Sequence, residues 1–191
     1  MRSVCVYCGS NSGNDPAFGE ATRALANLLV ARGIRIIYGG AALGLMGLLA
    51  DTAMKAGGEV VGVLPQGLKD REIGHPGLTE LHLVASMHER KAMMAELSEG
   101  FIALPGGIGT LEELIEIYTW GQLGLHRKPL GMLNVNGYYD ALGAFLDHAV
   151  DSGFLHPQQR AVMRMEADPE RLLEALGEPV PEPAVKWLDP Q

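Results

Sequence analysis

The glycine-rich run that ends at Glu113 carries the clearest chemistry in this chain. Its sequence is LPGGIGTLEE, so three glycines precede a predicted helix whose first turn includes Glu112 and Glu113. Glycine lets the backbone approach a ligand closely, and the free N–H groups at a helix start bind anions, most often phosphate. A bare phosphate site needs no acid. The two carboxylates therefore indicate chemistry performed on a phosphorylated small molecule.

A second segment, MHERK, places two cations in the first turn of a helix that Ser86 is expected to cap. Cations at that end of a helix are disfavoured by a few tenths to about 1 kcal/mol, so an anionic ligand beside Arg90 and Lys91 would explain them. A solvated surface pair is the alternative. Glu113 also has an alternative, because Thr110 and Glu113 have the spacing of a capping box, which would only close the helix.

Short β-branched runs alternate with amphipathic stretches along the chain, a pattern typical of a parallel sheet covered by helices. We expect strands at 3–7, 34–38, 60–64, 81–84, 101–104 and 131–135, and helices at 16–32, 45–56, 87–98, 110–123, 138–151 and 169–176. The predicted fold is α/β, a Rossmann-like doubly wound parallel sheet with helices on both faces. It forms a single nucleotide-binding domain over residues 1–177, followed by a proline-rich tail at 178–191.

Three of the predicted strand-to-helix turns are rich in glycine, at 8–13, 39–47 and 105–113. Ligands of open parallel sheets bind at the carboxyl ends of the strands, so these turns are expected to meet at one edge. None of them fits the dinucleotide fingerprint or the P-loop of NTPases. A polar connection at 66–80 is expected to cross the mouth of the same edge.

The composition of the chain excludes several classes of ligand. The 191-residue chain has a net charge of −8 and a pI near 5.2, which argues against a nucleic-acid polymer as ligand. Its first apolar run is too short for a signal peptide or a membrane span, so we expect a cytoplasmic protein. Cys5 and Cys8 form a C-x-x-C that we interpret as buried strand residues rather than a redox or zinc pair. No histidine or acidic cluster has metal-ligand spacing, and we expect neither a metal nor a cofactor.

The motifs PGGIGTLEE and MHERK together resemble those of the LONELY GUY family, the cytokinin riboside 5′-monophosphate phosphoribohydrolases. The resemblance extends to CVYCGSNSG at the N-terminus, to YGGAALGLMG, to the segment REI at 71–73 and to YTW at 118–120, so it spans most of the first 130 residues. Related proteins are often labelled lysine decarboxylases. The sequence does not support that label, because a pyridoxal enzyme needs a Schiff-base lysine and Lys91, the one lysine in a motif, follows an arginine at a helix start.

The resemblance implies hydrolysis of the N-glycosidic bond of a nucleoside 5′-monophosphate to a free base and ribose 5-phosphate. It implies Arg90 and Glu113 as the catalytic pair. The substrate-binding positions that it implies are Glu72, Lys91, Gly107, Ile108, Gly109, Thr110, Leu111, Glu112 and Thr119. At 100° per residue Thr119 lies over Glu112 rather than Glu113. One of the two positions is therefore expected to approach the ligand differently, for example across a subunit interface.

The family also implies a homodimer, formed through the helices that carry Arg90 and Glu113. One departure from its pattern is Ala41, where many members have a third glycine. An apolar pocket for an N6-isopentenyl group could come from Met46, Met87, Met93 and Met94, although methionines at helical spacing are more often core residues. Two alternatives stay open: a broader nucleosidase acting on AMP, and a non-catalytic carrier of a nucleotide or of molybdenum cofactor.

Overall fold

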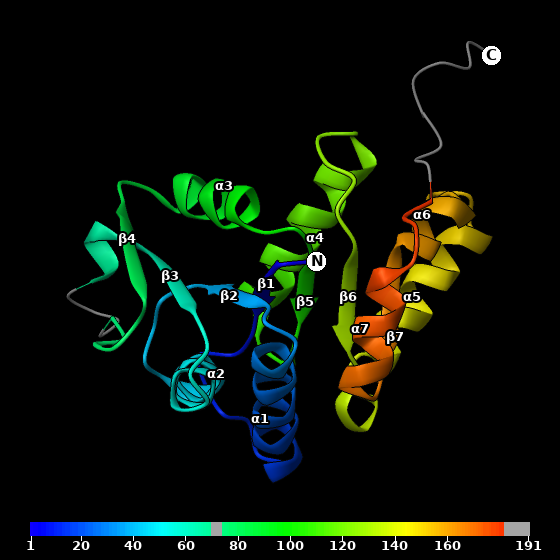
Figure 1. The fold of residues 1–191 in the computed structure, drawn as a ribbon. Coiled ribbons are helices and arrows are strands. Elements are labelled where there is room, and N and C mark those ends of the chain that lie inside the picture. The colour runs from blue at the N-terminus through cyan, green and yellow to red at the C-terminus, as the bar shows by residue number, and fades with distance from the viewer. Residues whose placement is uncertain (70–73, 182–191) are drawn as a thin grey trace.

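The computed structural model describes residues 1–69 and 74–181, and in that part of the chain a seven-stranded parallel sheet forms the centre (Figure 1). The strand order is β4-β3-β2-β1-β5-β6-β7, and every pairing is parallel. The strands are β1 (Ser3–Tyr7), β2 (Arg35–Tyr38), β3 (Val60–Pro65), β4 (Glu80–Val84), β5 (Phe101–Ala103), β6 (Leu130–Leu133) and β7 (Met163–Glu166). The predicted doubly wound α/β fold is confirmed.

Seven α-helices connect and cover these strands within the described residues. They are α1 (Pro16–Ala31), α2 (Gly44–Lys55), α3 (Met87–Leu97), α4 (Ile108–Gln122), α5 (Asp140–Asp151), α6 (Pro157–Val162) and α7 (Pro169–Gly177). The expected start of α1 is confirmed, because the Asp15 side chain accepts a hydrogen bond from the backbone N–H of Ala17 at 2.9 Å. Two short 3₁₀ turns, Gln66–Leu68 and Val135–Gly137, follow β3 and β6.

Alternate residues of each central strand enter two separate cores, one on each face of the sheet. Val4 and Val6 of β1 pack with α1, α2 and α7, whereas Cys5 and Tyr7 pack with α3, α4 and α5. Both faces are therefore buried, which explains why the strands read as continuous apolar runs. Cys5 in β1 and Cys8 directly after it are free and buried, as expected, and burial raises the pKa of each thiol.

The prediction missed α6 and β7, which follow one another at the far edge of the sheet (Figure 1). The four residues of β7 read MRME, and only Met163 is buried. An edge strand of this kind gains its place through ladder hydrogen bonds to β6 rather than through an apolar run, so hydrophobic patterning gives no signal for it.

The chain order creates a switch point between β1 and β5. From β1 the chain adds β2, β3 and β4 outward in one direction and then returns to place β5 on the other side of β1. Ligands of open α/β sheets bind in the crevice where the strand order reverses. The turn after β1 and the glycine run after β5 both begin at this point.

The connection expected at 66–80 is only partly described. Residues 70–73, with the predicted substrate contact Glu72, lie outside the described residues. Within the described part of the connection, the backbone N–H of His75 donates to the carbonyl oxygen of Gly40 at 3.0 Å. No helix in the described part of the chain has the length and apolar character needed to cross a bilayer.

Candidate active site

A cavity of about 320 Å³ opens at the switch point, at the carboxyl ends of β1 and β5. Its walls come from the end of β1 and the turn after it, from Gly39 after β2, and from the N-terminal parts of α2, α3 and α4. The lining residues are Val6, Tyr7, Cys8, Ser10, Gly39, Met46, Met87, Arg90, Gly107, Ile108, Gly109, Thr110, Glu112 and Glu113. Residues from both predicted motifs therefore meet in one place.

The three glycine-rich turns converge, and the close approach of their backbones requires glycine. A Cβ on Gly44 would lie 2.4 Å from the carbonyl carbon of Ser10, and a Cβ on Gly9 would lie 3.3 Å from the Cα of Gly106. Hydrogen bonds fix the same contacts, since the Gly9 N–H donates to Pro105 O at 3.1 Å and the Leu45 N–H donates to Gly9 O at 3.0 Å. The predicted meeting of the turns at one edge is confirmed.

The start of α4 has the features of an anion site. Its N-cap is Gly107, and no side chain caps the helix. The first N–H groups of a helix have no acceptor within it, so those at the start of α4 are available to a ligand. Thr110 is the third helical residue rather than the N-cap, so the capping-box interpretation of Glu113 is wrong.

Two glycines at this helix start leave open space. A Cβ on Gly107 or on Gly109 would meet no atom of the protein within 4 Å, and both residues line the cavity. The fold does not need glycine at these positions, and glycine in a helix costs about 1 kcal/mol relative to alanine. The space that they leave suits a ligand that contacts the backbone directly.

Arg90 and Glu113 form an ion pair in the wall of the cavity. Nη1 of Arg90 lies 3.1 Å from Oε1 of Glu113, and the two side chains are only 9% and 11% exposed. The Arg90 Nε–H donates to the carbonyl oxygen of Val63, near the end of β3, at 3.1 Å.

Two predictions about the start of α3 are corrected. Arg90 is the fourth residue of α3 and lies just beyond its first turn, in which it was predicted to lie. The solvated-pair alternative is wrong, because Arg90 and Lys91 are both buried.

The Glu113 carboxylate is incompletely satisfied. Its Oε1 is buried and has no hydrogen-bond partner among the described residues, although the guanidinium of Arg90 lies within ion-pair distance. Burial raises the pKa of Glu113 to about 7, and the charge of Arg90 opposes that rise. A carboxylate that titrates near neutral pH at the wall of a cavity is suited to general acid–base chemistry.

Gly39 makes room for the guanidinium. A Cβ at this position would lie 1.8 Å from Nη2 of Arg90 and 2.6 Å from the terminal methyl carbon of Met46. The backbone φ of Gly39 is not in the left-handed region, so the requirement for glycine here is one of space. The turn after β2 thereby fixes where the arginine can lie.

Lys91 occupies a different environment from Arg90. Its Nζ lies 2.5 Å from Oε1 of Glu112 and 3.0 Å from Oε2 of Glu116, so it joins α3 to α4 beside the cavity. Burial disfavours the Lys91 cation, but the hydrogen bonds to the two carboxylates outweigh that effect and its pKa is raised. Of the predicted substrate contacts, Lys91 and Leu111 do not line the cavity.

Thr119 is also outside the cavity. It is exposed, and its hydroxyl donates to the carbonyl oxygen of Ile115 at 2.7 Å within α4. The predicted separation of Thr119 from Glu113 around the helix is therefore found.

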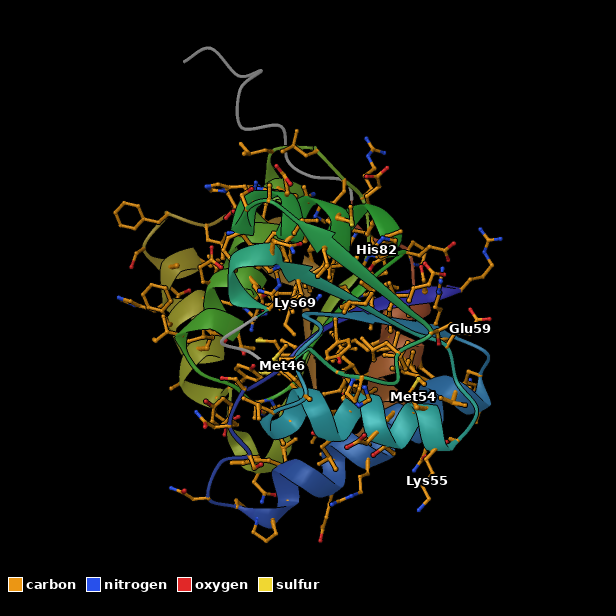
Figure 2. The ribbon with its side chains drawn as sticks, turned by 90° about the vertical axis from the view of Figure 1, so that its left-hand side faces the viewer. Met46, Met54, Lys55, Glu59, Lys69 and His82 are labelled. Carbon is orange, nitrogen blue, oxygen red and sulfur yellow. The ribbon has the colours of Figure 1, made fainter. Side chains whose placement is uncertain are left out.

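Sequence reasoning missed several residues that line the cavity, among them Tyr7, Cys8 and Ser10. Their position in the sequence could have indicated them, because Tyr7 ends β1 and the other two lie in the glycine-rich turn that follows it. Of the four methionines expected near an apolar group, Met46 and Met87 line the cavity, and Figure 2 labels Met46 at the start of α2. Met93 and Met94 instead belong to the core beneath α3.

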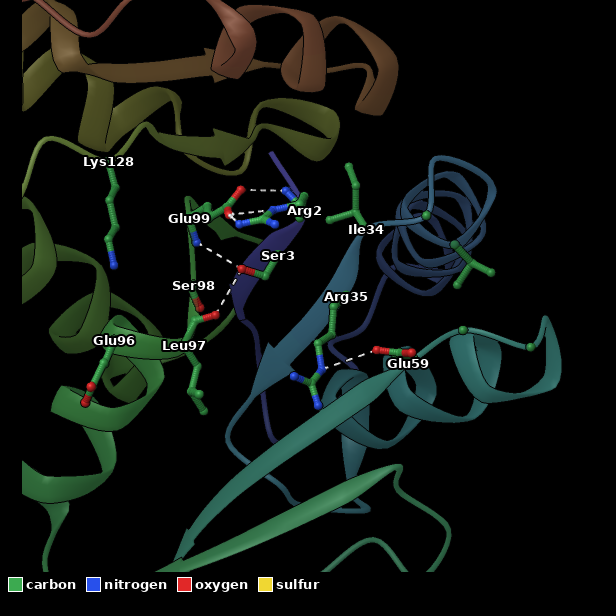
Figure 3. Close-up of a pocket in the computed structure, with 14 residues that line it drawn as sticks. Arg2, Ser3, Ile34, Arg35, Glu59, Glu96, Leu97, Ser98, Glu99 and Lys128 are labelled. Atoms are coloured by element: carbon green, nitrogen blue, oxygen red, sulfur yellow. Dashed lines mark hydrogen bonds and ion pairs between the residues drawn. The ribbon is translucent and has the colours of Figure 1, made fainter.

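A larger cavity of about 710 Å³ lies at the opposite, amino edge of the sheet (Figure 3). Its cations already have partners: Arg2 pairs with Glu99 at 3.1 Å, Arg35 pairs with Glu59 at 3.5 Å, and Lys128 donates to a backbone carbonyl at 2.7 Å. No metal-ligating group of three or more His, Cys, Asp or Glu side chains occurs in residues 1–69 and 74–181. The cavity at the switch point is thus the better candidate.

Comparison with known proteins agrees with this assignment. Residues 46–176 match a family model described as "Possible lysine decarboxylase". The chain is 49% identical over 182 residues to the cytokinin riboside 5′-monophosphate phosphoribohydrolase LOG7 of Arabidopsis thaliana, covering 95% of this chain and 84% of that protein. The chain belongs to the LONELY GUY family. A probable member from Oryza sativa subsp. japonica, LOGL3, is 47% identical over 181 residues, 95% of this chain and 86% of its own length.

Solved structures share the LONELY GUY fold at lower identity. The molybdenum cofactor carrier protein of Chlamydomonas reinhardtii aligns with a TM-score of 0.66 and 19% identity, over 93% of this chain and 99% of its own. The molybdenum cofactor binding protein of Rippkaea orientalis also has a TM-score of 0.66 and 19% identity, over 91% of this chain and 94% of its own. At such identities the likeness establishes the fold only.

The description of the family model as a lysine decarboxylase finds no support in this LONELY GUY site. A pyridoxal enzyme needs a lysine amine that can form a Schiff base at the cofactor. Lys91 is the one lysine among the predicted site residues, and its ammonium lies between the carboxylates of Glu112 and Glu116. Its raised pKa opposes the deprotonation that Schiff-base formation requires.

We predict that Gly109→Ala separates stability from ligand binding. The new methyl group meets no protein atom and favours the helix, so the free energy of unfolding should rise by about 0.5–1 kcal/mol. The same methyl group would occupy ligand space, and affinity for a nucleoside 5′-monophosphate should fall at least about tenfold. Urea unfolding and calorimetric titration measure the two effects.

The matched control for this prediction is Gly19→Ala in α1. A Cβ there would make ordinary contacts at 3.5 Å, and Gly19 does not line the cavity. It should stabilise the protein similarly and leave nucleotide affinity unchanged. Unaltered affinity in the Gly109 variant would contradict the assignment of the open space to a ligand.

Proposed function

We propose that this protein hydrolyses the N-glycosidic bond of cytokinin riboside 5′-monophosphates, which are N6-modified forms of AMP, to the free base and ribose 5-phosphate. The observation that carries the proposal is the buried Arg90–Glu113 pair beside an uncapped helix start in one cavity. The names of relatives such as LOG7 support the same activity. A carrier protein has no evident use for a carboxylate that titrates near neutral pH.

The 5′-phosphate is assigned to the start of α4. Backbone N–H groups at Gly107, Ile108 and Gly109 would donate to its oxygens, assisted by the helix dipole. Thr110 lines the same cavity, and its hydroxyl would add a further donor. A nucleotide whose phosphate is held here would extend its ribose toward Glu113, which follows Ile108 by five residues in α4.

Glu113 and Arg90 then act on the glycosidic bond. Cleavage passes through an oxocarbenium-like state, which the ionised Glu113 would stabilise. A water oxygen bonds to C1′ of the ribose and loses a proton to the carboxylate, while the electron pair of the C1′–N9 bond leaves with the base. Arg90 would stabilise the negative charge on the departing base, which finally takes up a proton.

The base is assigned to the part of the cavity near Met46 and Met87. Methionine side chains adapt to irregular apolar groups, so they suit an N6-isopentenyl substituent. Met87 is 40% exposed and Met46 is 8% exposed, so Met87 is the more accessible of the two side chains. AMP uses the same catalytic residues and lacks only these apolar contacts.

The direct test is to incubate the protein with N6-isopentenyladenosine 5′-monophosphate and, separately, with AMP. We expect base and ribose 5-phosphate in equal amounts, with the modified nucleotide preferred. Glu113→Gln and Arg90→Ala should each lower kcat/KM by at least about 100-fold, because each removes a group that acts in the transition state. Chromatography of both products is the measurement. Nucleotide binding without base release would instead favour a carrier.

The pH dependence of kcat/KM provides a second test. Burial raises the pKa of Glu113 to about 7, so the active carboxylate form is lost as the pH falls below that value. Activity should therefore decline toward a tenfold loss per pH unit on the acid side of about pH 7. A profile from pH 5 to 9 measures this limb.

The substrate phosphate itself titrates near pH 6, so a variant is needed to assign the limb. The charge of Lys91 lowers the pKa of Glu113, whereas Glu112 and Glu116 raise it. Lys91→Gln should consequently move the limb to higher pH. An acid limb that stays near pH 6 in both proteins would belong to the substrate and not to Glu113.

We further propose that the protein is a homodimer whose helices α4 pack together. Ile108 and Ile115, 81% and 38% exposed, share one face of α4 with Thr119, since their spacings of 7 and 11 residues return to nearly the same angle. A partner copy on this face would cover apolar surface that is otherwise in water. It would also bring Thr119 toward a cavity of the other subunit.

Replacing Ile115 by glutamate tests this proposal. A charge at the centre of the face should convert the protein to a monomer and lower its activity at least about tenfold. Light scattering after size-exclusion chromatography measures the mass. Phe154→Glu is the control, because Phe154 is 82% exposed on the turn after α5 and should leave the dimer intact. A fully active monomeric wild type would refute the proposal.

A further inference from the structure

The segment between β6 and α5 contacts the glycine-rich run directly. The hydroxyl of Tyr138 donates to the carbonyl oxygen of Gly106 at 2.5 Å, and the hydroxyl of Tyr139 donates to that of Leu104 at 2.7 Å. The carbonyl between them, that of Pro105, accepts from the Gly9 N–H at 3.1 Å. Three consecutive carbonyls of the run are therefore each held by a donor from another part of the chain.

This arrangement orients the peptide units that precede α4. A carbonyl oxygen that pointed toward a phosphate would repel it. The carbonyl oxygens of residues 104–106 instead point toward the donors that bind them, in other parts of the chain. Because a trans peptide unit is planar, its N–H points opposite to its C=O. The bond from Tyr138 to Gly106 O thus directs the Gly107 N–H away from the tyrosine. Gly107 is the N-cap of α4 and a wall of the cavity.

Tyr138 is itself held in place by packing. Its ring lies edge-to-face against Phe18 at 5.5 Å and against Tyr139 at 5.1 Å between centroids. Two residues before it, Asn136 has a φ of 50°, in the left-handed region that is uncommon for a residue other than glycine. The Asn136 side chain donates to Oδ2 of Asp15 at 3.0 Å, at the N-cap of α1. A strained residue thus persists where a hydrogen bond anchors it.

We propose that Tyr138 is a positioning residue for phosphate recognition. Its hydroxyl fixes the Gly106–Gly107 peptide so that the N–H groups at the start of α4 are oriented before a ligand arrives. The inference rests on the proposed function, because it concerns the 5′-phosphate of the same substrate. Tyr138 does not line the catalytic cavity, but it lines the adjoining one of about 260 Å³, which shares Ser10 and Gly107 with it.

Tyr138→Phe is the decisive variant, since it keeps the ring and removes only the hydroxyl. Loss of one such hydrogen bond should weaken binding of ribose 5-phosphate about 3- to 10-fold. It should raise the KM for the nucleotide by a similar factor and leave kcat within about twofold. The preference for the nucleotide over the riboside without phosphate should fall by the same factor, a change that a general loss of stability would not produce.

The matched control is Tyr118→Phe. The Tyr118 hydroxyl donates to the backbone carbonyl of Gln159 at 2.9 Å, outside the cavity. This variant should keep the affinity for ribose 5-phosphate and the preference for the nucleotide. Asn136→Gly gives an independent check, because glycine accepts the positive φ while the bond to Asp15 is lost. It should weaken ribose 5-phosphate binding in the same direction as Tyr138→Phe.

Calorimetric titration with ribose 5-phosphate separates this proposal from the proposed function. Equal affinity of Tyr138→Phe and wild type, with both folded by circular dichroism, would overturn the role of Tyr138. If the wild type binds ribose 5-phosphate but releases no base from any nucleotide, only the hydrolase proposal is refuted. Weaker binding of ribose 5-phosphate by Tyr138→Phe would then still support the positioning role.

Discussion

The buried contact between Arg90 and Glu113 is the constraint around which the cavity is organised. A buried carboxylate or guanidinium without a counter-charge is costly, and removing one partner of a buried pair typically destabilises a protein by about 3–5 kcal/mol. The pair therefore fixes the spacing of α3 and α4. It also explains Gly39, since any side chain there would displace the guanidinium. Structure and chemistry depend on the same two charges, and the incomplete satisfaction of Glu113 leaves its carboxylate available to a substrate.

The glycines of this site serve two separate purposes. Gly9, Gly44 and Gly106 allow backbones to approach one another, because a Cβ at any of them would lie within 3.0 Å of another atom. Gly107 and Gly109 meet nothing, and the room beside them belongs to the cavity. The first group builds the junction of the turns, and the second keeps the start of α4 open. A single glycine-rich sequence thus combines a requirement of the fold with a requirement of binding.

Consecutive residues of α3 show how a helix separates two charges. A step of 100° directs Arg90 toward the cavity and Lys91 toward Glu112 and Glu116. Lys91 therefore acts on Glu113 through its charge rather than through a direct bond, and it lowers the pKa that burial raises. The acid–base properties of the site are consequently set by residues of both α3 and α4, including some outside the cavity.

The sequence by itself determined the α/β fold and the convergence of the glycine-rich turns, and its motifs singled out Arg90 and Glu113 as the candidate catalytic pair. Apolar periodicity, glycine spacing and short motifs are all local features. It did not reveal β7, which depends on ladder bonds to β6. Nor did it decide between a capping role and a cavity position for Glu113, or separate Lys91 from Arg90. Those answers depend on where α4 begins and how α3 packs against it, and only the tertiary structure fixes the distances between residues far apart in the chain.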